Sequence, residues 1–375
     1  MASASALLYT FVVARPRRDT SLPKEHRRLY IDKSNTDLSQ VKFRIEQEPL
    51  PQPRYGQVLV RVAAVAINPS DFNEWKSPRS VDKPFGNEAS GVVVASGGGF
   101  LAGQLMGKKV GILRQGRTKT AAEYVCLDAT SNVWSLPDAA LVEDAAGWFI
   151  NPFTVLAILS TASKHGTGLV HTGASSQLGQ MMVKRIAQAN KQGSKKMTLV
   201  NVVRREEHVD QLKRLGAEHV ICQASKESWL KELKKEVEES KIRVSFDAVS
   251  GDMSGQLLAN MPKKGLVYVY GVLAGQPVGQ IDPLDLIYRQ KQIKGFLVGD
   301  WISQGGPLVT AARMYWATQQ VGSQLSGDGW AASQYHDCTM AASQYHDCTM
   351  ETMESSFSEL VQKGFTGKKL RIRMY

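Results

Sequence analysis

The stretch Gly168-Leu-Val-His-Thr-Gly-Ala-Ser-Ser-Gln-Leu-Gly179, with the residues that follow it up to Arg205, decides the fold of this chain. An apolar strand at residues 169–170 runs into a glycine turn at residues 173–179. Apolar side chains then recur every three or four positions as far as Ala189, which predicts a helix, and residues 197–203 form a second apolar strand. Strand, glycine turn, helix and strand predict the first half of a nucleotide-binding βαβ unit.

The glycine turn has the chemistry that a pyrophosphate group needs. Glycine lets the backbone come close to the phosphates, and the start of the helix offers free N–H groups and the positive end of its dipole. The full Gly-x-Gly-x-x-Gly pattern is absent because serine occupies two positions where glycine could stand, so a purely structural turn is the alternative. The residues expected to line the pyrophosphate are Gly173, Ala174, Ser175, Ser176, Gln177, Leu178 and Gly179.

The end of the second strand predicts which nucleotide binds. Arg204 and Arg205 stand where a cofactor with two free ribose hydroxyls would need an acid, and Glu206 and Glu207 come only after them. Arginine suits a 2′-phosphate because its planar fork matches phosphate oxygens. We therefore expect NADPH as the cofactor rather than NADH, with a solvated pair of surface arginines as the alternative.

The composition limits the class of protein. A length of 375 residues allows about two domains, and 43% hydrophobic residues are enough for substantial cores. No apolar run reaches the roughly 18 residues of a membrane span, so we expect no transmembrane segment, and four cysteines favour a reducing compartment. The net charge of +11 is dispersed and no nucleic-acid motif accompanies it, so we expect no nucleic-acid partner.

Residues 1–26 read as an extension before the fold begins. Residues 1–18 contain no acid and combine alanine, serine and leucine with three arginines, a composition typical of a mitochondrial presequence. An extra edge strand at residues 7–13 is the alternative, because Tyr-Thr-Phe-Val-Val favours strands. We expect a mitochondrial location, with a cytoplasmic one as the alternative.

The hydrophobic pattern predicts two domains. Short strands between glycine and proline turns, from residue 28 to residue 127, predict a compact antiparallel, barrel-like domain. From residue 142 onward helices and strands alternate, which predicts a doubly wound parallel sheet, and residues 369–374 should return to the first domain as a strand. The expected boundaries are 27–150 with 345–375 for the first domain and 151–344 for the second.

One decapeptide occurs twice in direct succession. Ala-Ala-Ser-Gln-Tyr-His-Asp-Cys-Thr-Met fills residues 331–340 and again residues 341–350. Two copies do not make a solenoid, so a duplicated surface segment or an error in the underlying sequence explains the repeat better. Its His-x-Cys pairs suggest a metal site, but duplication alone generates them, and we expect no metal site here.

The whole pattern resembles the medium-chain dehydrogenase/reductase superfamily over about residues 28–375. The resemblance rests on Ala66-Ile-Asn-Pro-Ser-Asp71 and Gly86-Asn-Glu-Ala-Ser-Gly91 in the first domain, and on residues 173–180 and Leu215-Gly-Ala-Glu-His-Val220 in the second. It implies an α/β architecture, in which an N-terminal GroES-like β-barrel domain accompanies a Rossmann domain with a doubly wound parallel sheet.

Zinc-using members of this superfamily carry a histidine at the position of Asn87 and a cysteine in the loop that holds residues 68–70. Neither is present here, so the resemblance implies the zinc-free branch of quinone reductases and mitochondrial 2-enoyl-thioester reductases. The second group fits better. It shares the serine-containing turn, Asn-Val-Val-Arg-Arg at 201–205, Asn-Pro-Phe-Thr at 151–154 and Gly-Phe…Trp at 295–301.

The resemblance also implies roles for single residues. Arg204 would hold the 2′-phosphate, Ser175 and Ser176 would line the pyrophosphate, and Asn68 and Thr154 would approach the nicotinamide. Tyr270, Gly271 and Phe296 would complete the cofactor site. Each catalytic candidate has a simpler alternative, because Asn68 could only cap a turn and Thr154 could only open a helix.

One departure concerns the proton donor. Enoyl-thioester reductases carry a tyrosine implied to assist protonation, and its position falls near Arg79 in a stretch without tyrosine. Arg79 could polarise the acceptor, bind a phosphate of an acyl carrier, or be solvated surface. The predicted activity is hydride transfer from NADPH to an enoyl thioester, an enone or a quinone, with Asn68, Thr154 and Arg79 as catalytic candidates.

Two further expectations concern assembly. Family members are commonly dimers through an edge strand, which residues 281–298 could supply, so the resemblance implies a homodimer. The alternative from another class is a reductase fold that serves as an accessory subunit of a larger mitochondrial complex.

Overall fold

A computed structural model describes residues 21–114, 116–193, 196–224, 228–325, 329–332, 350, 353, 357 and 370–374, together with the backbone of residues 17–18, 345–349 and 369. The chain divides into two compact units. Unit 1 comprises residues 1–146, 347–358 and 371–375, and unit 2 comprises residues 147–346 and 359–370. One unit has an antiparallel sheet and the other a parallel sheet, which confirms the predicted fold class, whereas the predicted domain boundaries stay a prediction.

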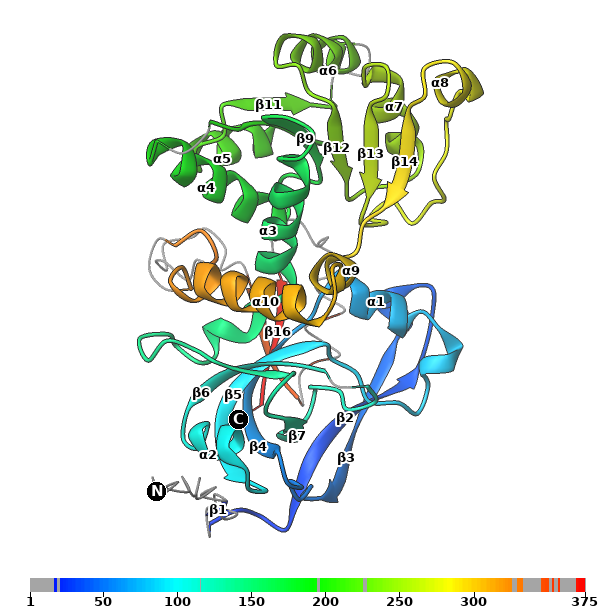
Figure 1. The fold of residues 1–375 in the computed structure, drawn as a ribbon. Helices are drawn as coiled ribbons and strands as arrows, with labels where there is room; N and C mark the ends of the chain where they lie inside the picture. Colours follow the sequence, from blue (N-terminus) through cyan, green and yellow to red (C-terminus); the bar gives the residue numbers. More distant parts are fainter. Residues whose placement is uncertain are drawn as a thin grey trace, which may run out of the picture. The chain divides into compact units, whose positions relative to one another are not determined.

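An antiparallel sheet of eight strands forms the frame of unit 1 (Figure 1). The strands run in the order β15-β16-β4-β5-β6-β8, while β1 pairs with β5 and β7 pairs with β4. Two irregularities in the β4–β5 register increase its twist, so the sheet curls. These strands are β1 (Arg17–Arg18), β4 (Gln57–Ala66), β5 (Glu88–Ser96), β6 (Lys109–Leu113), β7 (Tyr124–Asp128), β8 (Val133–Ser135), β15 (Tyr345–Thr349) and β16 (Lys369–Arg373). A hairpin of β2 (Glu25–Lys33) and β3 (Lys42–Pro49) stands beside this sheet.

An aromatic cluster fixes the short helix α1 (Pro69–Trp75) in unit 1. The fully buried Trp75 ring lies 4.9 Å from the Phe43 ring, 5.2 Å from Phe85 and 5.0 Å from Phe357, measured between centroids. Such contacts between aromatic rings anchor a side chain strongly. The cluster therefore holds the whole segment that begins at Asn68.

The predicted return of the C-terminal segment is confirmed. β16 pairs antiparallel with β4, with Ile372 opposite Val65. Arg371 is 1% exposed, and its guanidinium contacts the Asp144 carboxylate at 2.9 Å. A buried cation needs such a partner, because an unpaired buried charge is costly.

Six parallel strands form the sheet of unit 2, in the order β11-β10-β9-β12-β13-β14. Strand order reverses between β9 and β12, which is the place where open α/β sheets bind nucleotides. The strands are β9 (Gly168–Thr172), β10 (Thr198–Val203), β11 (His219–Cys222), β12 (Val244–Asp247), β13 (Leu266–Val269) and β14 (Gln292–Gly295). The helices are α3 (Ile150–Ala162), α4 (Gln177–Lys191), α5 (Glu207–Arg214), α6 (Ser228–Glu239), α7 (Asp252–Asn260), α8 (Pro283–Ile287), α9 (Val298–Ser303) and α10 (Pro307–Gly322).

Alternating side chains bury both faces of this sheet. Val170 and Val200 pack with Trp229 of α6 and Leu257 of α7 in one core, in which α6 and α7 lie together (Figure 1). Side chains that point to the other face of the sheet, such as Leu199, lie next to α4 instead. Among the described residues, one helical stretch, Asp144–Ala162, is long and apolar enough to cross a membrane, and 78% of it is buried. A core helix meets the same criterion, so this is weak evidence for a span.

Several element boundaries differ from those expected. β14 ends at Gly295, so Phe296 follows the strand instead of belonging to it, and α3 begins at Ile150, before Thr154. Helices α1, α2 (Phe100–Gln104), α8, α9 and α10 have no counterpart in the sequence pattern, because the first four span only five to seven residues. The expected presequence at residues 1–18 and its alternative, an edge strand at residues 7–13, lie outside the described side chains, as does most of the repeat, residues 333–344.

Candidate cofactor and active site

The turn after β9 has a backbone conformation that requires glycine. Gly173 has φ +62°, and a Cβ there would lie 3.1 Å from the Cβ of Ala248. Ser176 then caps α4, because its Oγ accepts a hydrogen bond from the Gly179 N–H at 3.2 Å. The α4 N-terminus therefore begins at the carboxyl edge of the sheet, with further N–H groups in its first turn that have no helical partner.

Close packing holds α4 against this turn. A Cβ at Gly179 would lie 2.3 Å from the carbonyl oxygen of Ala174, so only glycine fits. The Gln180 side-chain amide donates to the Ser175 carbonyl at 2.9 Å. Asn151 of α3 donates its Nδ2 to Gln177 Oε1 at 3.0 Å, which ties α3 to the start of α4. Residues 173–179 therefore form one rigid turn.

A buried polar network spans the point where strand order reverses. Thr172, at the end of β9, donates its hydroxyl to Asp247 Oδ1 at 2.7 Å, and Asp247 ends β12. The second carboxylate oxygen of Asp247 accepts from the Ser254 hydroxyl at 2.6 Å and from the Ser250 N–H at 3.1 Å. We did not single out Asp247 from the sequence as a site residue. A polar residue at the end of an apolar strand was the signal that could have identified it.

The two arginines after β10 have different surroundings. Arg205 contacts Glu207 at 3.0 Å and His208 Nε2 at 3.1 Å, so its guanidinium is engaged. Arg204 is exposed and makes no ion pair with any residue that the structure describes. Its guanidinium is therefore free to take an anionic ligand.

The three later cofactor candidates lie at the carboxyl ends of β13 and β14. Tyr270 directs its hydroxyl to His171 Nε2 at 2.6 Å, and burial lowers the pKa of His171 to about 3, so that imidazole is neutral. Gly271 passes so close to Ala248 that a Cβ would lie 2.6 Å from the Ala248 carbonyl oxygen. Phe296 packs edge-on against Phe246, with ring centroids 5.4 Å apart. Both aromatic candidates are thus half-buried in contacts of their own.

Thr154 lies in the second turn of α3 and is 7% exposed. Its hydroxyl donates to the Ile150 carbonyl at 2.6 Å. Thr154 therefore does not open the helix, which begins at Ile150, and its one donor is engaged within α3. The hydroxyl oxygen retains a lone pair that can accept a hydrogen bond.

In unit 1, Asn68 is buried in a cluster of carboxylates. Its Nδ2 donates to Glu88 Oε1 at 2.9 Å, and its backbone N–H donates to Asp71 Oδ2 at 2.8 Å. Its Oδ1 accepts no hydrogen bond from the described residues and is buried. A buried, unsatisfied acceptor is costly, so this oxygen is the feature of Asn68 that a ligand could satisfy.

Asp71 is the most perturbed acid of this cluster. Burial raises the pKa of its carboxyl to about 7. Asn87 donates its Nδ2 to Asp71 Oδ1 at 2.7 Å, and Lys119 Nζ contacts Asn87 Oδ1 at 3.3 Å and both oxygens of Glu74 at 2.7 and 2.8 Å. We did not assign Asp71 a role from the sequence, although an acid three residues after the candidate Asn68 was a signal.

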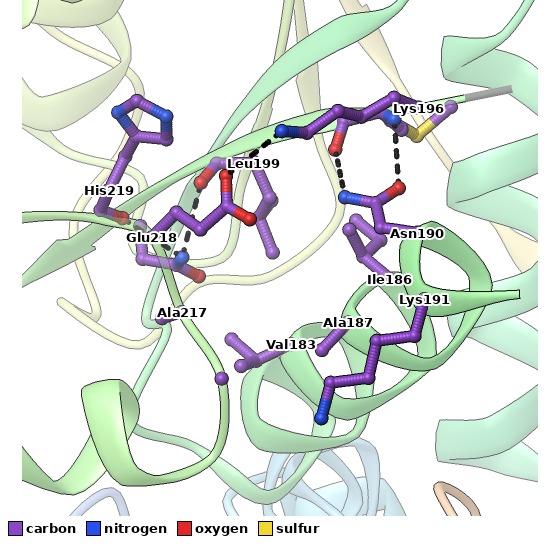
Figure 2. A pocket seen from close by; sticks show the side chains of 13 residues that line it. Val183, Ile186, Ala187, Asn190, Lys191, Lys196, Leu199, Ala217, Glu218 and His219 are labelled. Atoms are coloured by element: carbon purple, nitrogen blue, oxygen red, sulfur yellow. Dashed lines mark hydrogen bonds and ion pairs between the residues drawn. The ribbon is translucent and has the colours of Figure 1, made fainter. Parts of the chain in front are cut away.

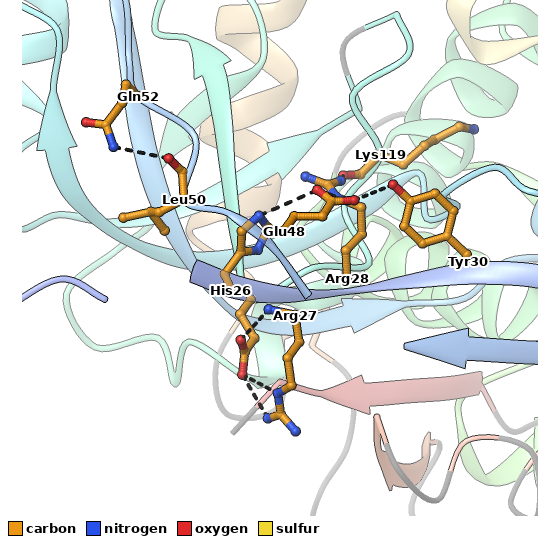
Figure 3. A network of polar contacts seen from close by, with 9 residues as sticks. His26, Arg27, Arg28, Tyr30, Glu48, Leu50, Gln52 and Lys119 are labelled. Carbon is orange, nitrogen blue, oxygen red and sulfur yellow. Dashed lines mark hydrogen bonds and ion pairs between the residues drawn. The ribbon is translucent and has the colours of Figure 1, made fainter. Parts of the chain in front are cut away.

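The cluster continues into the β2–β3 hairpin (Figure 3). Arg28 donates NH1 to the Lys119 carbonyl at 3.3 Å and its Nε to Glu48 at 3.0 Å. Tyr30 also donates its hydroxyl to Glu48, and burial raises the pKa of that phenol to about 12. Arg28 therefore fixes the backbone of Lys119, while the ammonium of Lys119 contacts Asn87.

Arg79 lies apart from the polar contacts of this cluster. It belongs to a 3₁₀ turn, Pro78–Ser80, and its side chain is exposed. Its backbone N–H donates to the Ser77 hydroxyl. The structure gives the Arg79 side chain no polar contact with another described residue, as a solvated surface arginine would have.

A pocket of about 250 Å³ in unit 2 lies at the edge opposite to the glycine turn (Figure 2). It is lined by residues at the C-terminal end of α4 and at the amino ends of β10 and β11. Lys196 pairs there with Glu218 at 3.8 Å, and Asn190 exchanges two hydrogen bonds with the Met197 backbone. This pocket contains none of the predicted cofactor residues, which gather at the carboxyl edge.

Known families match both units. Residues 54–138 match the alcohol dehydrogenase GroES-like domain, and residues 178–310 match the zinc-binding dehydrogenase family. The chain belongs to the medium-chain dehydrogenase/reductase superfamily. It is a nicotinamide-dependent oxidoreductase, which agrees with the nucleotide-binding architecture of unit 2.

Individual relatives fall into two groups. The mitochondrial enoyl-acyl-carrier-protein reductase of Xenopus tropicalis is 27% identical over 277 residues, which cover 69% of this chain and 74% of that protein. The human protein of the same name is 27% identical over 265 residues, with 68% of each chain covered. Among solved structures, the Escherichia coli quinone oxidoreductase complexed with NADPH has a TM-score of 0.74 and 18% identity, with 93% of this chain and 100% of that chain covered. At that identity the structural likeness concerns the fold.

Proposed function

We propose that this protein is a zinc-free, NADPH-dependent reductase that transfers hydride to an enoyl thioester, an enone or a quinone. The observation that carries the choice of NADPH is the exposed guanidinium of Arg204 directly after β10, which makes no ion pair with the described residues. A 2′-phosphate would give this cation a bidentate partner, whereas a ribose hydroxyl would not. Arg205 would assist less, because Glu207 and His208 already engage it.

The donors around Asn87 support a zinc-free site. The Asn87 amide contacts the Asp71 carboxylate on one side and the Lys119 ammonium on the other. Neutral amides are not typical zinc ligands, and an ammonium beside the amide oxygen would repel a divalent cation. The described residues contain no group of three or more His, Cys, Asp or Glu side chains that could hold a metal ion. Stoichiometric zinc in the purified protein would contradict this part of the proposal.

The side chains of each unit have distinct tasks in this proposal. When bound, NADPH supplies the hydride. The N–H groups at the start of α4 would bind its pyrophosphate, with the hydroxyl of Ser175 beside them. In unit 2 the hydroxyl oxygen of Thr154 would accept a hydrogen bond from an N–H group of the nicotinamide carboxamide. In unit 1 Asn68 Oδ1 is a buried acceptor that a ligand could satisfy. Their donors are already engaged with Glu88 and Ile150, which favours this role over polarising a substrate carbonyl.

The substrate class rests on the relatives and on one missing residue. The curated relatives named above are enoyl reductases, which supports an enoyl thioester. No tyrosine occupies the stretch around Arg79, and a quinone needs an enzyme-held proton donor less strictly than an enoyl thioester does, which supports a quinone. Arg79 remains a candidate for contact with the acceptor. The accessory-subunit alternative has no support among the relatives.

Steady-state turnover tests the function directly. NADPH oxidation would be followed with a crotonyl thioester, with a simple enone and with a benzoquinone. We expect turnover with at least one acceptor, and a preference for the thioester would identify an enoyl reductase. Tight NADPH binding without turnover of any acceptor would overturn the reductase proposal while leaving the cofactor site intact.

Location and assembly complete the proposal. The acid-free composition of residues 1–18 and the names of the curated relatives support a mitochondrial location, which imaging of the tagged full-length chain would test. β14 ends the sheet order of unit 2, and Ile287 and Tyr288 beside it are 64% and 72% exposed. A strand edge that no other described strand covers, with apolar neighbours, supports a homodimer through this edge.

A further inference from the structure

Cations without an ion pair among the described residues gather at the amino edge of the parallel sheet of unit 2. The loops that lead into β9, β12 and β13, residues 163–166, 240–243 and 261–265, contain five basic residues besides His165 and no acid. We call the exposed set formed by these five and one residue of β14 the basic edge. It consists of Lys164, Lys241, Arg243, Lys263, Lys264 and Lys294.

Five members of the basic edge lie at the amino ends of neighbouring strands. β9, β12 and β13 are adjacent in the sheet, so strand spacing alone spreads these five over about 10 Å, and Lys294 lies within the next strand, β14, level with Tyr268. None of the six cations makes an ion pair with a residue that the structure describes. The β10 and β11 end of the same edge differs, because Lys196 pairs with Glu218 and His219 pairs with Glu236.

The imidazole of His165 lies in the positive electrostatic potential of the basic edge. The pKa of its imidazole is lowered, first by burial and then by the charges of Lys294, Lys164 and Arg243. No acid in the described part of the chain opposes these three cations at the ring. Cations from three separate segments therefore act on the same imidazole.

A pocket adjoins the row and adds an apolar surface to it. It has a volume of about 310 Å³ and lies between the ends of α6 and α7 and the loop before β12. Three cations, Lys234, Lys241 and Arg243, line it together with one acid, Glu238. Its remaining wall is largely apolar and includes Met261. Cations beside an apolar wall match a molecule that joins a phosphate to hydrocarbon.

We propose that the basic edge docks unit 2 on a membrane surface that contains anionic phospholipids. Spread, exposed lysines suit an extended negative surface, because each adds attraction without needing a fixed geometry. A single soluble phosphate would be held better by converging donors, and nucleic acid would leave the apolar wall of the pocket unused. The site is remote from the glycine turn at the carboxyl edge, so this proposal does not depend on the substrate.

Vesicle co-sedimentation of the full-length protein tests the proposal. One set of vesicles would contain phosphatidylcholine alone, and the other would also contain phosphatidylglycerol. The edge variant would carry Lys164→Glu, Arg243→Glu and Lys263→Glu. The matched control would carry Lys24→Glu, Lys33→Glu and Lys108→Glu, which remove the same charge from exposed sites in unit 1.

We expect the wild type and the control to bind only the vesicles with phosphatidylglycerol, and high salt to release them. The edge variant should bind about a hundredfold more weakly or worse, as expected from about three lost contacts, with an unchanged melting temperature and unchanged NADPH affinity. No binding at low salt, or equal weakening in the control, would overturn the proposal. Equally tight binding of the wild type to duplex DNA or to inorganic phosphate, competing with the vesicles, would also overturn it, since the edge would then bind phosphate from any source.

Discussion

At the scale of single residues, two adjacent arginines have different chemical surroundings. Arg204 is exposed and free of ion pairs within the described part of the chain, whereas Arg205 is held by Glu207 and His208. A cation that is already paired gains less from a new anionic partner. The sequence predicts that both arginines lie at the nucleotide. Their side-chain contacts indicate that Arg204 contributes more than Arg205 to binding a 2′-phosphate.

Arg204→Ala should therefore weaken NADPH binding by about 1.5–3 kcal/mol, roughly tenfold to a hundredfold, and leave NADH binding nearly unchanged. Arg205→Ala is the matched comparison and should cost less. Calorimetric titration of both variants with both nucleotides measures these differences. Equal weakening for the two cofactors would contradict the assignment of Arg204 to the 2′-phosphate.

A second prediction at this scale concerns Asp71. Its carboxyl pKa is raised to about 7 by burial, from 3.8 for an exposed aspartate. Folding therefore favours the protonated form, and the stability that this proton contributes is complete below about pH 4 and is lost as the pH rises through 7. The full difference is on the order of 4 kcal/mol.

Asp71→Asn should flatten this dependence, because an amide does not titrate. We expect thermal unfolding temperatures of the variant to fall less between pH 5 and pH 8 than those of the wild type. The variant should also be less stable at pH 5, since an amide cannot accept from both Asn68 and Asn87. Asp138→Asn, at an exposed site of the same unit, should leave the wild-type slope unchanged, and an identical slope for Asp71→Asn would refute the buried-proton explanation.

At the scale of secondary-structure elements, the β9–α4 junction is set by close backbone contact. The periodicity of residues 178–189 predicts α4, and the glycines mark its start. What the pattern cannot give is how tightly α4 approaches the turn. A Cβ at Gly179 would lie 2.3 Å from a backbone oxygen, which cannot move aside as a flexible side chain can.

Gly179→Ala should displace the first turn of α4 and destabilise the protein by about 1–3 kcal/mol. NADPH affinity should fall as well, because the N–H groups of that turn would no longer converge on the pyrophosphate. Gly299→Ala is the matched control, since Gly299 lies in α9 and a Cβ there would meet no other atom within 4 Å. Chemical denaturation measures both, and a neutral Gly179→Ala would show that α4 does not need this contact.

At the scale of the whole molecule, the exposed edge of β14 and the apolar side chains of α8 predict assembly. Ile287→Glu would place a charge in the proposed interface, so we expect a shift from dimer to monomer in sedimentation equilibrium. Leu141→Glu changes a residue of unit 1 with similar exposure, 66% against 64% for Ile287, and should leave the dimer intact. A wild type that is monomeric at micromolar concentration would remove the homodimer from the proposal.

The sequence by itself determined the alternation of strands and helices that builds the parallel sheet of unit 2, and the returning strand β16, because these depend on local periodicity and on glycine positions. It also placed the glycine turn and the two arginines at one edge, since the carboxyl ends of parallel strands meet there. It missed short helices such as α1, because a few residues carry too little periodic signal.

Only the tertiary structure decided how the polar side chains pair. Asn68 meets Glu88, and Asp71 meets Asn87, across 20 and 16 residues of sequence. The pKa of Asp71 depends on the burial of its carboxyl in the folded protein as much as on the carboxyl itself. Hydrogen bonds and desolvation act over a few ångströms in space, and a linear pattern does not contain those distances.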